Sequence, residues 1–249
     1  PLSINPETNS YYYHDFPQIT MRDIVRANDL LCQHLSIKKI QVIIGGSIGG
    51  FQALEWAIMK PDLFDNLVLL VTSARTSPWA IAINESQRMA IEADSSFSKM
   101  DESAGIGGMR VARSIALLSY RNYQTYLMTQ KDTDTGKVDD YRACSYQRYQ
   151  GEKLARRFNA FSYYVLSKAL DSHNVGRKRD GLKNALAKIK AHTIVIGINT
   201  DNLFPVDEQK FIADHVMDAK YFELDSKYGH DGFLIETTEI TSILKQNLK

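Results

Sequence analysis

The sequence has little of what marks nucleic-acid-binding or membrane proteins. Its 30 Lys and Arg residues nearly balance its 29 Asp and Glu residues, which leaves a net charge of +1 over 249 residues. Because the positive and negative charges nearly cancel, there is no electrostatic reason to expect nucleic acid or an anionic membrane as a partner. No apolar run approaches the roughly 18 residues that a membrane-spanning helix needs. The composition, 44% hydrophobic and 24% charged, is that of an ordinary globular protein.

Cysteine is also scarce. Cys32 and Cys144 are the only two, and they lack the close spacing of metal ligands. Two scattered cysteines in a chain of this length are typical of a reduced, cytoplasmic protein, whereas small secreted domains are dense in disulfides. We therefore expect no metal centre and a cytoplasmic location.

The strands and helices that the sequence does predict follow an α/β order. A β-branched run at 40–44 reads as a buried strand, a glycine-rich turn and a helix at 49–59 follow, and a second buried strand lies at 67–72. Strands return at 193–198 and 220–224. This order predicts an α/β fold with a mostly parallel sheet.

The segment between the two groups of strands reads as helical. Periodic apolar patterns there predict helices at 83–94, 105–120, 150–170 and 180–189, with an exposed polar loop from Lys131 to Asp140. A last helix is expected at 233–247. We therefore assign residues 1–75 and 189–249 to an α/β core and residues 76–188 to a helical insertion.

The turn after the first strand has the form G-x-S-x-G, from Gly45 to Gly49. Between a strand and a helix, this motif places a serine on a tight turn above the sheet, where it can act as a nucleophile. The helix N-terminus favours a developing anion, and the backbone N–H of Ile48 would be one oxyanion donor. The alternative is a glycine-rich turn in which Ser47 is only structural.

A serine nucleophile needs a base, and the base needs an orienting carboxylate, in the chain order Ser, acid, His. Asp201 follows strand 193–198, at the sheet edge that carries the sites of parallel sheets. His230 lies in a loop past the last strand. Asp207 lies farther into the next predicted helix, and His173 precedes the acid, which is the wrong order. The sequence therefore predicts a triad of Ser47, Asp201 and His230, with a helix cap and a plain loop histidine as the alternative roles of the last two.

These motifs resemble the homoserine O-acetyltransferase family, acyltransferases of the α/β-hydrolase superfamily. The matching segments are SINP, DFPQITMRDIV, IGGSIGGFQALEWA, DNLFP and YGHDGFLIE, and the resemblance runs over essentially the whole chain. It implies an α/β-hydrolase fold in which the insertion forms a lid. The family has further strands upstream, with a loop that gives a second oxyanion N–H. The sequence starts at Pro1 within what reads as an interior stretch, so we expect the N-terminal strands to be missing and residues 1–249 alone to be inactive or unstable.

The resemblance also implies an activity. Family members transfer an acetyl group from acetyl-CoA to the hydroxyl of L-homoserine, in methionine biosynthesis, through a ping-pong acyl-serine mechanism without a metal or a permanently bound cofactor. They are cytoplasmic and usually homodimers, paired through the insertion. Arg113 matches the arginine that binds the substrate carboxylate, and Asp231 matches the aspartate that binds the amino group. Arg110 and Arg121 lie close enough for the match of Arg113 to slip.

Three other functions use the same residues. Some relatives use succinyl-CoA or L-serine, an esterase or thioester hydrolase has the same triad, and a non-catalytic binding protein can keep the fold. The pair of Arg113 and Asp231 favours the transferase, because a simple esterase needs neither residue.

Overall fold

The computed structural model describes every residue from Pro1 to Lys249 and divides into two compact units. The sheet unit comprises residues 20–77 and 172–249, and the helical unit comprises residues 1–19 and 78–171. The structure has no helix that is both long and apolar enough to cross a membrane. It also has no group of three or more His, Cys, Asp or Glu side chains placed to hold a metal ion.

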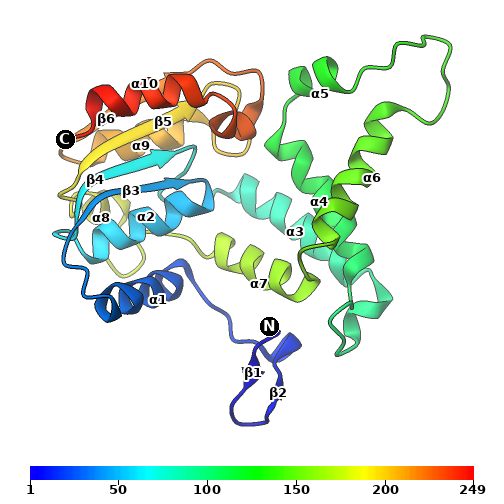
Figure 1. Ribbon diagram of the computed structural model, residues 1–249, viewed down its shortest axis with the longest axis horizontal. Coiled ribbons are helices and arrows are strands. Elements are labelled where there is room, and N and C mark those ends of the chain that lie inside the picture. The colour runs from blue at the N-terminus through cyan, green and yellow to red at the C-terminus, as the bar shows by residue number, and fades with distance from the viewer. The chain divides into compact units, whose positions relative to one another are not determined.

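The sheet unit is built on four parallel strands in the order β3-β4-β5-β6 (Figure 1). They are β3 (Ile40–Gly46), β4 (Phe64–Leu70), β5 (His192–Ile198) and β6 (Ala219–Leu224). The strand order follows the chain, and the predicted α/β fold with a parallel sheet is confirmed. Strand β4 begins before the expected position 67, because the polar side chain of Asn66 is buried in the sheet and donates to the carbonyl of Gln41 at 3.0 Å.

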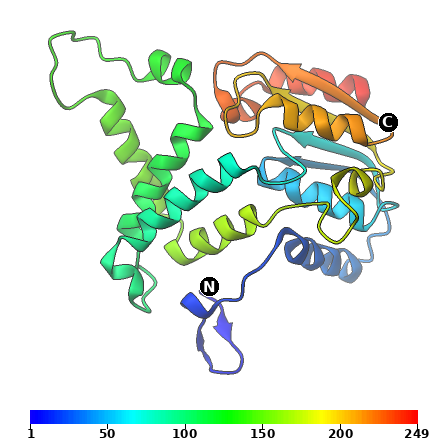
Figure 2. The ribbon, with the colours of Figure 1, turned by 180° about the vertical axis from the view of Figure 1, so that it is seen from behind.

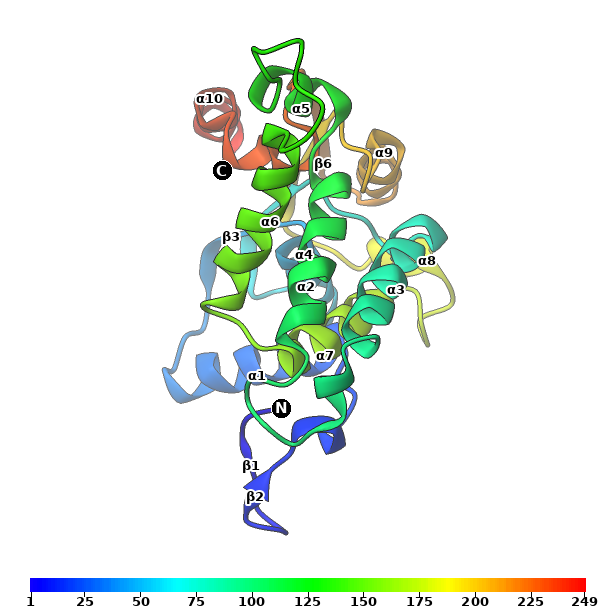
Figure 3. The same ribbon diagram turned by 90° about the vertical axis from the view of Figure 1, so that its right-hand side faces the viewer.

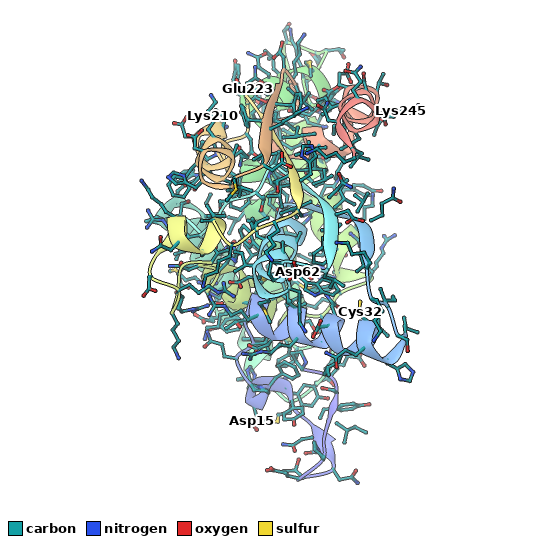
Figure 4. The ribbon with its side chains drawn as sticks, turned by 90° about the vertical axis from the view of Figure 1, so that its left-hand side faces the viewer. Asp15, Cys32, Asp62, Lys210, Glu223 and Lys245 are labelled. Carbon is teal, nitrogen blue, oxygen red and sulfur yellow. The ribbon has the colours of Figure 1, made fainter.

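Helices cover both faces of this sheet. One face packs against α2 (Ile48–Met59), α8 (Leu182–Leu186) and α9 (Val206–His215), and α1 (Met21–His34) packs on α2. The other face packs against α10 (Thr237–Asn247). Figures 3 and 4 show this layering from two sides: in Figure 4, Lys210 of α9 and Lys245 of α10 flank the strand that carries Glu223.

Strand periodicity explains why both faces are apolar. In β4, Leu67 and Leu69 point to the α2 face while Val68 and Leu70 point to the α10 face, and none of the four exceeds 6% exposure. A sheet buried on both sides forms where parallel strands connect through helices, as the uninterrupted apolar strand runs predicted.

A buried ion cluster ties α1 and α2 to the chain segment before α8. Glu55 of α2 is 1% exposed and accepts from Arg22 of α1 at 3.2 Å and from Arg179 at 2.7 Å. Arg22 also donates to the carbonyl of Arg177 at 2.8 Å, and Arg179 to that of Val175 at 2.8 Å. One carboxylate therefore pairs with two guanidinium groups, and each guanidinium also donates to backbone carbonyls.

The helical unit contains five α-helices and an N-terminal hairpin. These are α3 (Pro78–Glu92), α4 (Ile106–Tyr120), α5 (Tyr123–Thr129), α6 (Arg142–Ala155), α7 (Ala160–Asp171), and the two-residue strands β1 (Ile4–Asn5) and β2 (Ser10–Tyr11). The loop between α5 and α6 extends away from the other helices of this unit (Figures 1 and 2). It includes the polar stretch that the sequence predicts as an exposed loop.

The single helix predicted at 150–170 is wrong, because α6 ends at Ala155 and α7 begins at Ala160. Asn159 accepts from the backbone N–H of Ser162 at 2.8 Å and so satisfies a free donor at the start of α7. The break contains neither glycine nor proline, which is why the periodic pattern concealed it.

Residues 1–19 were predicted to belong to the α/β core, but they pack with the helical unit. The imidazole of His14 bonds the carbonyl of Phe97 at 2.7 Å, and the ring of Tyr13 lies 5.1 Å from that of Phe161. Aromatic rings of the N-terminal segment thus join the apolar core of the helices, and this contact is invisible in a stretch without periodicity.

Candidate active site

Ser47 sits on a strained turn between β3 and α2. Its backbone has φ 53° and ψ −121°, a conformation that costs a non-glycine residue on the order of 1–3 kcal/mol. Two bonds hold it there: its N–H donates to the carbonyl of Leu70 at 2.9 Å, and its carbonyl accepts from the hydroxyl of Thr72 at 2.9 Å. The tight turn that the sequence predicts at Ser47 is therefore present and is fixed by residues of and just after the neighbouring strand.

Two glycines let strand and helix cross at this turn. A Cβ on Gly45 would lie 2.3 Å from the carbonyl oxygen of Gly49, and one on Gly50 would lie 2.5 Å from the side chain of Thr72. A Cβ on Gly49 would meet nothing within 4 Å. The close packing thus depends on Gly50, outside the five-residue motif, more than on Gly49 within it.

The first N–H groups of α2 lie beside Ser47. Ile48 begins the helix directly after Ser47, and its N–H takes part in no hydrogen bond within the chain. Such free donors at a helix start carry the positive end of the helix dipole. Ile48 therefore keeps the donor that an oxyanion beside Ser47 would need.

The three predicted triad residues come together in one hydrogen-bonded chain. His230 lies with its Nε2 2.9 Å from Ser47 Oγ and its Nδ1 2.7 Å from Asp201 Oδ2. His230 and Asp201 are 3% and 4% exposed. Because a carboxylate only accepts, Nδ1 carries the proton, which leaves the Nε2 lone pair facing the serine hydroxyl.

The acid is oriented by its own loop. The other carboxylate oxygen of Asp201 accepts from the backbone N–H groups of Leu203 at 2.8 Å and Phe204 at 2.9 Å. The rings of Phe204 and Phe233 lie 5.4 and 5.8 Å from the His230 ring. These apolar walls lower the local dielectric and strengthen the charge interactions inside the triad.

His173, the histidine whose position in the chain excluded it as the base, is part of the packed interior of the sheet unit. His173 is 2% exposed, stacks on Phe51 at 3.9 Å between ring centroids, and bonds the carbonyl of Ser73 through Nε2 at 3.1 Å. Burial lowers the pKa of His173 to about 3. It therefore stays neutral and packs against α2.

The two predicted substrate residues lie in different units. Asp231 directly follows His230 in the 3₁₀ turn Gly229–Leu234 of the sheet unit. Arg113, on α4 of the helical unit, lies over the ring of Tyr120 at 5.4 Å and lines a cavity of about 300 Å³ within that unit. Of its two neighbours in the sequence, Arg110 is instead paired with Glu152 at 2.9 Å.

The cavity beside Arg113 holds a polar pair that sequence reasoning missed. Tyr163 is mostly buried, which raises the pKa of its hydroxyl far above its usual range, and it donates to Gln87 Oε1. Gln87 is 3% exposed. Nothing in the sequence marks these two residues, because a tyrosine and a glutamine 76 positions apart form no motif.

Comparison with known proteins gives a consistent result. A family model of the alpha/beta hydrolase fold matches residues 3–237. The chain is 49% identical over 245 residues to homoserine O-acetyltransferase of Cyclobacterium marinum, with 98% of this chain and 70% of that protein covered. It is 40% identical to homoserine O-acetyltransferase of Trichormus variabilis, with 97% and 68% covered.

Solved structures give the same fold. The crystal structure of esterase E22 matches with a TM-score of 0.90 at 23% identity, over 100% of this chain and 72% of that one, which shows a shared fold alone. The identity to the two acetyltransferases, together with the matching family model, shows the closer relationship. The chain therefore belongs to the homoserine O-acetyltransferase family of transferases with the α/β-hydrolase fold.

Proposed function

We propose that this protein transfers an acetyl group from acetyl-CoA to the side-chain hydroxyl of L-homoserine, a step of methionine biosynthesis. The observation that carries the proposal is the hydrogen-bonded chain from Ser47 through His230 to Asp201, with distances of 2.9 and 2.7 Å. Such a chain activates a serine for acyl transfer. The two related proteins named homoserine O-acetyltransferase supply the acceptor.

The first half-reaction acylates the enzyme. His230 Nε2 takes the hydroxyl proton as Ser47 Oγ attacks the thioester carbonyl, and Asp201 stabilises the imidazolium that forms. The tetrahedral oxyanion accepts from Ile48 N–H. When the C–S bond breaks, His230 returns its proton to the sulfur of coenzyme A, and the acetyl ester of Ser47 remains.

The second half-reaction transfers the acetyl group. His230 takes the proton of the homoserine hydroxyl, whose oxygen attacks the acyl-serine carbonyl, and the proton then returns to Ser47 Oγ as the ester bond breaks. Arg113 would bind the substrate carboxylate and Asp231 its ammonium group. The cavity beside Arg113, and the position of Asp231 next to the base, support these roles.

We also propose that two chains pair through the insertion, residues 76–188, and that the protein works in the cytoplasm. The helices α4 and α6 expose large apolar side chains, with Val111 at 53%, Leu118 at 61% and Tyr149 at 56% exposure. Exposed apolar surface of this kind is common where subunits meet. Light scattering in solution measures the oligomeric state directly.

Both cysteines are free, which fits a reducing compartment such as the cytoplasm.

Intact-mass spectrometry tests the proposed reaction. The full-length protein is mixed with acetyl-CoA, measured, and measured again after L-homoserine is added, with Ser47→Ala as the control. We expect an acetyl adduct that persists in water, disappears with homoserine and never forms on the variant. An adduct that water alone removes would identify a hydrolase. An adduct that forms only from succinyl-CoA would identify succinyl-CoA, and not acetyl-CoA, as the acyl donor.

A further inference from the structure

Two buried side chains outside the triad connect the turn of the nucleophile to the loop of the acid. They are Thr72, just after β4, and Gln209, on α9, and both are fully buried. We propose that Thr72 and Gln209 are positioning residues that hold Ser47 and Asp201 at the separation that His230 must span. The inference rests on the proposed function only in that it takes the triad to be catalytic.

Thr72 fixes the peptide plane of the nucleophile. Its hydroxyl donates to the carbonyl of Ser47 at 2.9 Å, and the N–H of Gly50 donates to the same carbonyl at 2.9 Å. The Thr72 side chain also fills the place where Gly50 lacks one. Because Ser47 is held in a strained conformation, these contacts oppose its relaxation.

Gln209 joins this turn to the acid's loop. Its Nε2 donates to the carbonyl of Thr72 at 2.6 Å and to that of Phe204 at 3.3 Å, and Phe204 in turn donates its N–H to Asp201. Both hydrogens of one amide thus bind two loops that follow different strands. All of these residues belong to the sheet unit.

The amide oxygen of Gln209 makes no hydrogen bond, so only the amide N–H groups contribute hydrogen bonds to the fold. Its Oε1 is buried without a hydrogen-bond partner, a cost of about 1–3 kcal/mol. An apolar side chain of the same length would avoid that cost. The two hydrogen bonds that the amide donates are therefore the physical reason for a glutamine here. They complete a continuous series of hydrogen-bonded residues from Ser47 to Asp201.

Loss of this series of hydrogen bonds should slow chemistry more than binding. A misplacement of about 1 Å in a reacting group can cost on the order of 100-fold in rate. Neither residue is among the side chains proposed to bind homoserine, Arg113 and Asp231, so the KM for homoserine should change by no more than about twofold.

The test uses the full-length protein and two variants that keep side-chain shape. Gln209→Glu places a carboxylate oxygen against two carbonyl oxygens, and Thr72→Val removes only the hydroxyl. We measure the rate at which a fluorophosphonate labels Ser47, together with kcat and the KM for homoserine. We expect labelling and kcat to fall about 100-fold in Gln209→Glu and about 10-fold in Thr72→Val, and Thr72→Ser to restore them.

Thr193→Val is the matched control. Thr193 is also fully buried and donates to a carbonyl, that of Ala191 at 2.9 Å, but at the opposite end of β5 from the acid. It should lose stability and keep the labelling rate. If Gln209→Glu does not fold, Gln209→Met replaces it, since methionine has the length of glutamine without its donors.

Three results would overturn the inference: folded Thr72 and Gln209 variants that label as fast as the parent, a Thr72→Ser variant as slow as Thr72→Val, or an equal loss in Thr193→Val. The labelling reaction needs no homoserine. A parent that labels rapidly but transfers nothing to homoserine would therefore contradict the proposed function while the comparison of variants still decides the positioning roles.

Discussion

At the scale of single residues, the site depends on which atoms can only accept hydrogen bonds. Asp201 uses one oxygen for two backbone N–H groups and the other for His230 Nδ1. This arrangement fixes both the tautomer and the plane of the imidazole, so that the Nε2 lone pair faces the hydroxyl of Ser47. The carboxylate therefore acts on the serine only through the histidine.

Asp201→Asn should show how much this orientation contributes. The amide keeps the shape and one acceptor oxygen, and that oxygen can face either the backbone donors or His230 but not both. We expect kcat to fall on the order of 10⁴-fold while the KM for the acyl donor stays within about twofold. Steady-state kinetics measure both, and Asp207→Asn, an exchange outside the triad, serves as control. A loss below tenfold would contradict the assigned role.

At the scale of elements, the sequence predicted the regular strands and the glycine-rich turn, and it missed a helix break and the contacts between loops. The buried strands and the nucleophile turn were predicted because an apolar β-branched run followed by glycines has few other structures. The break at Asn159 was missed because its cap is a single side chain within a continuing helical pattern. Thr72 and Gln209 were missed because their meeting depends on how two loops fold back together, which no local pattern contains.

The ion pairs that attach helix α2 to its neighbours can be tested by substitution. Glu55 holds α2 to α1 and to the segment before α8 through two arginines. Replacing one partner of a buried ion pair leaves uncompensated charge, so Glu55→Gln should lower the free energy of unfolding by about 3 kcal/mol. Urea denaturation measures the change. Glu239→Gln, an exposed exchange on α10, should change it little, and equal effects of the two variants would show that the cluster contributes nothing.

At the scale of the whole molecule, the buried histidine makes the folding equilibrium depend on pH. The pKa of His173 is lowered from 6.5 to about 3 in the folded chain, so below pH 6.5 the unfolded chain binds a proton that the folded chain does not. Stability contributed by the neutral ring is therefore fully present above pH 6.5 and is lost as the pH falls towards 3. Carboxyl groups with lowered pKa values, such as Asp94 and Asp23, add the same trend only at more acidic pH, below their ordinary value of 3.8.

The interval between pH 6.5 and 4.5 thus isolates His173 from those two carboxyl groups. There we expect the free energy of unfolding of the parent to fall by up to about 1.4 kcal/mol per pH unit on account of this residue. His173→Gln should be less stable than the parent at pH 7, because it loses the stacking on Phe51, but its stability should fall less steeply with acid. Urea titrations of both proteins across this interval give the two slopes. Parallel slopes would mean that His173 takes up its proton in the folded chain as well, which the stacking on Phe51 and the burial of its ring oppose.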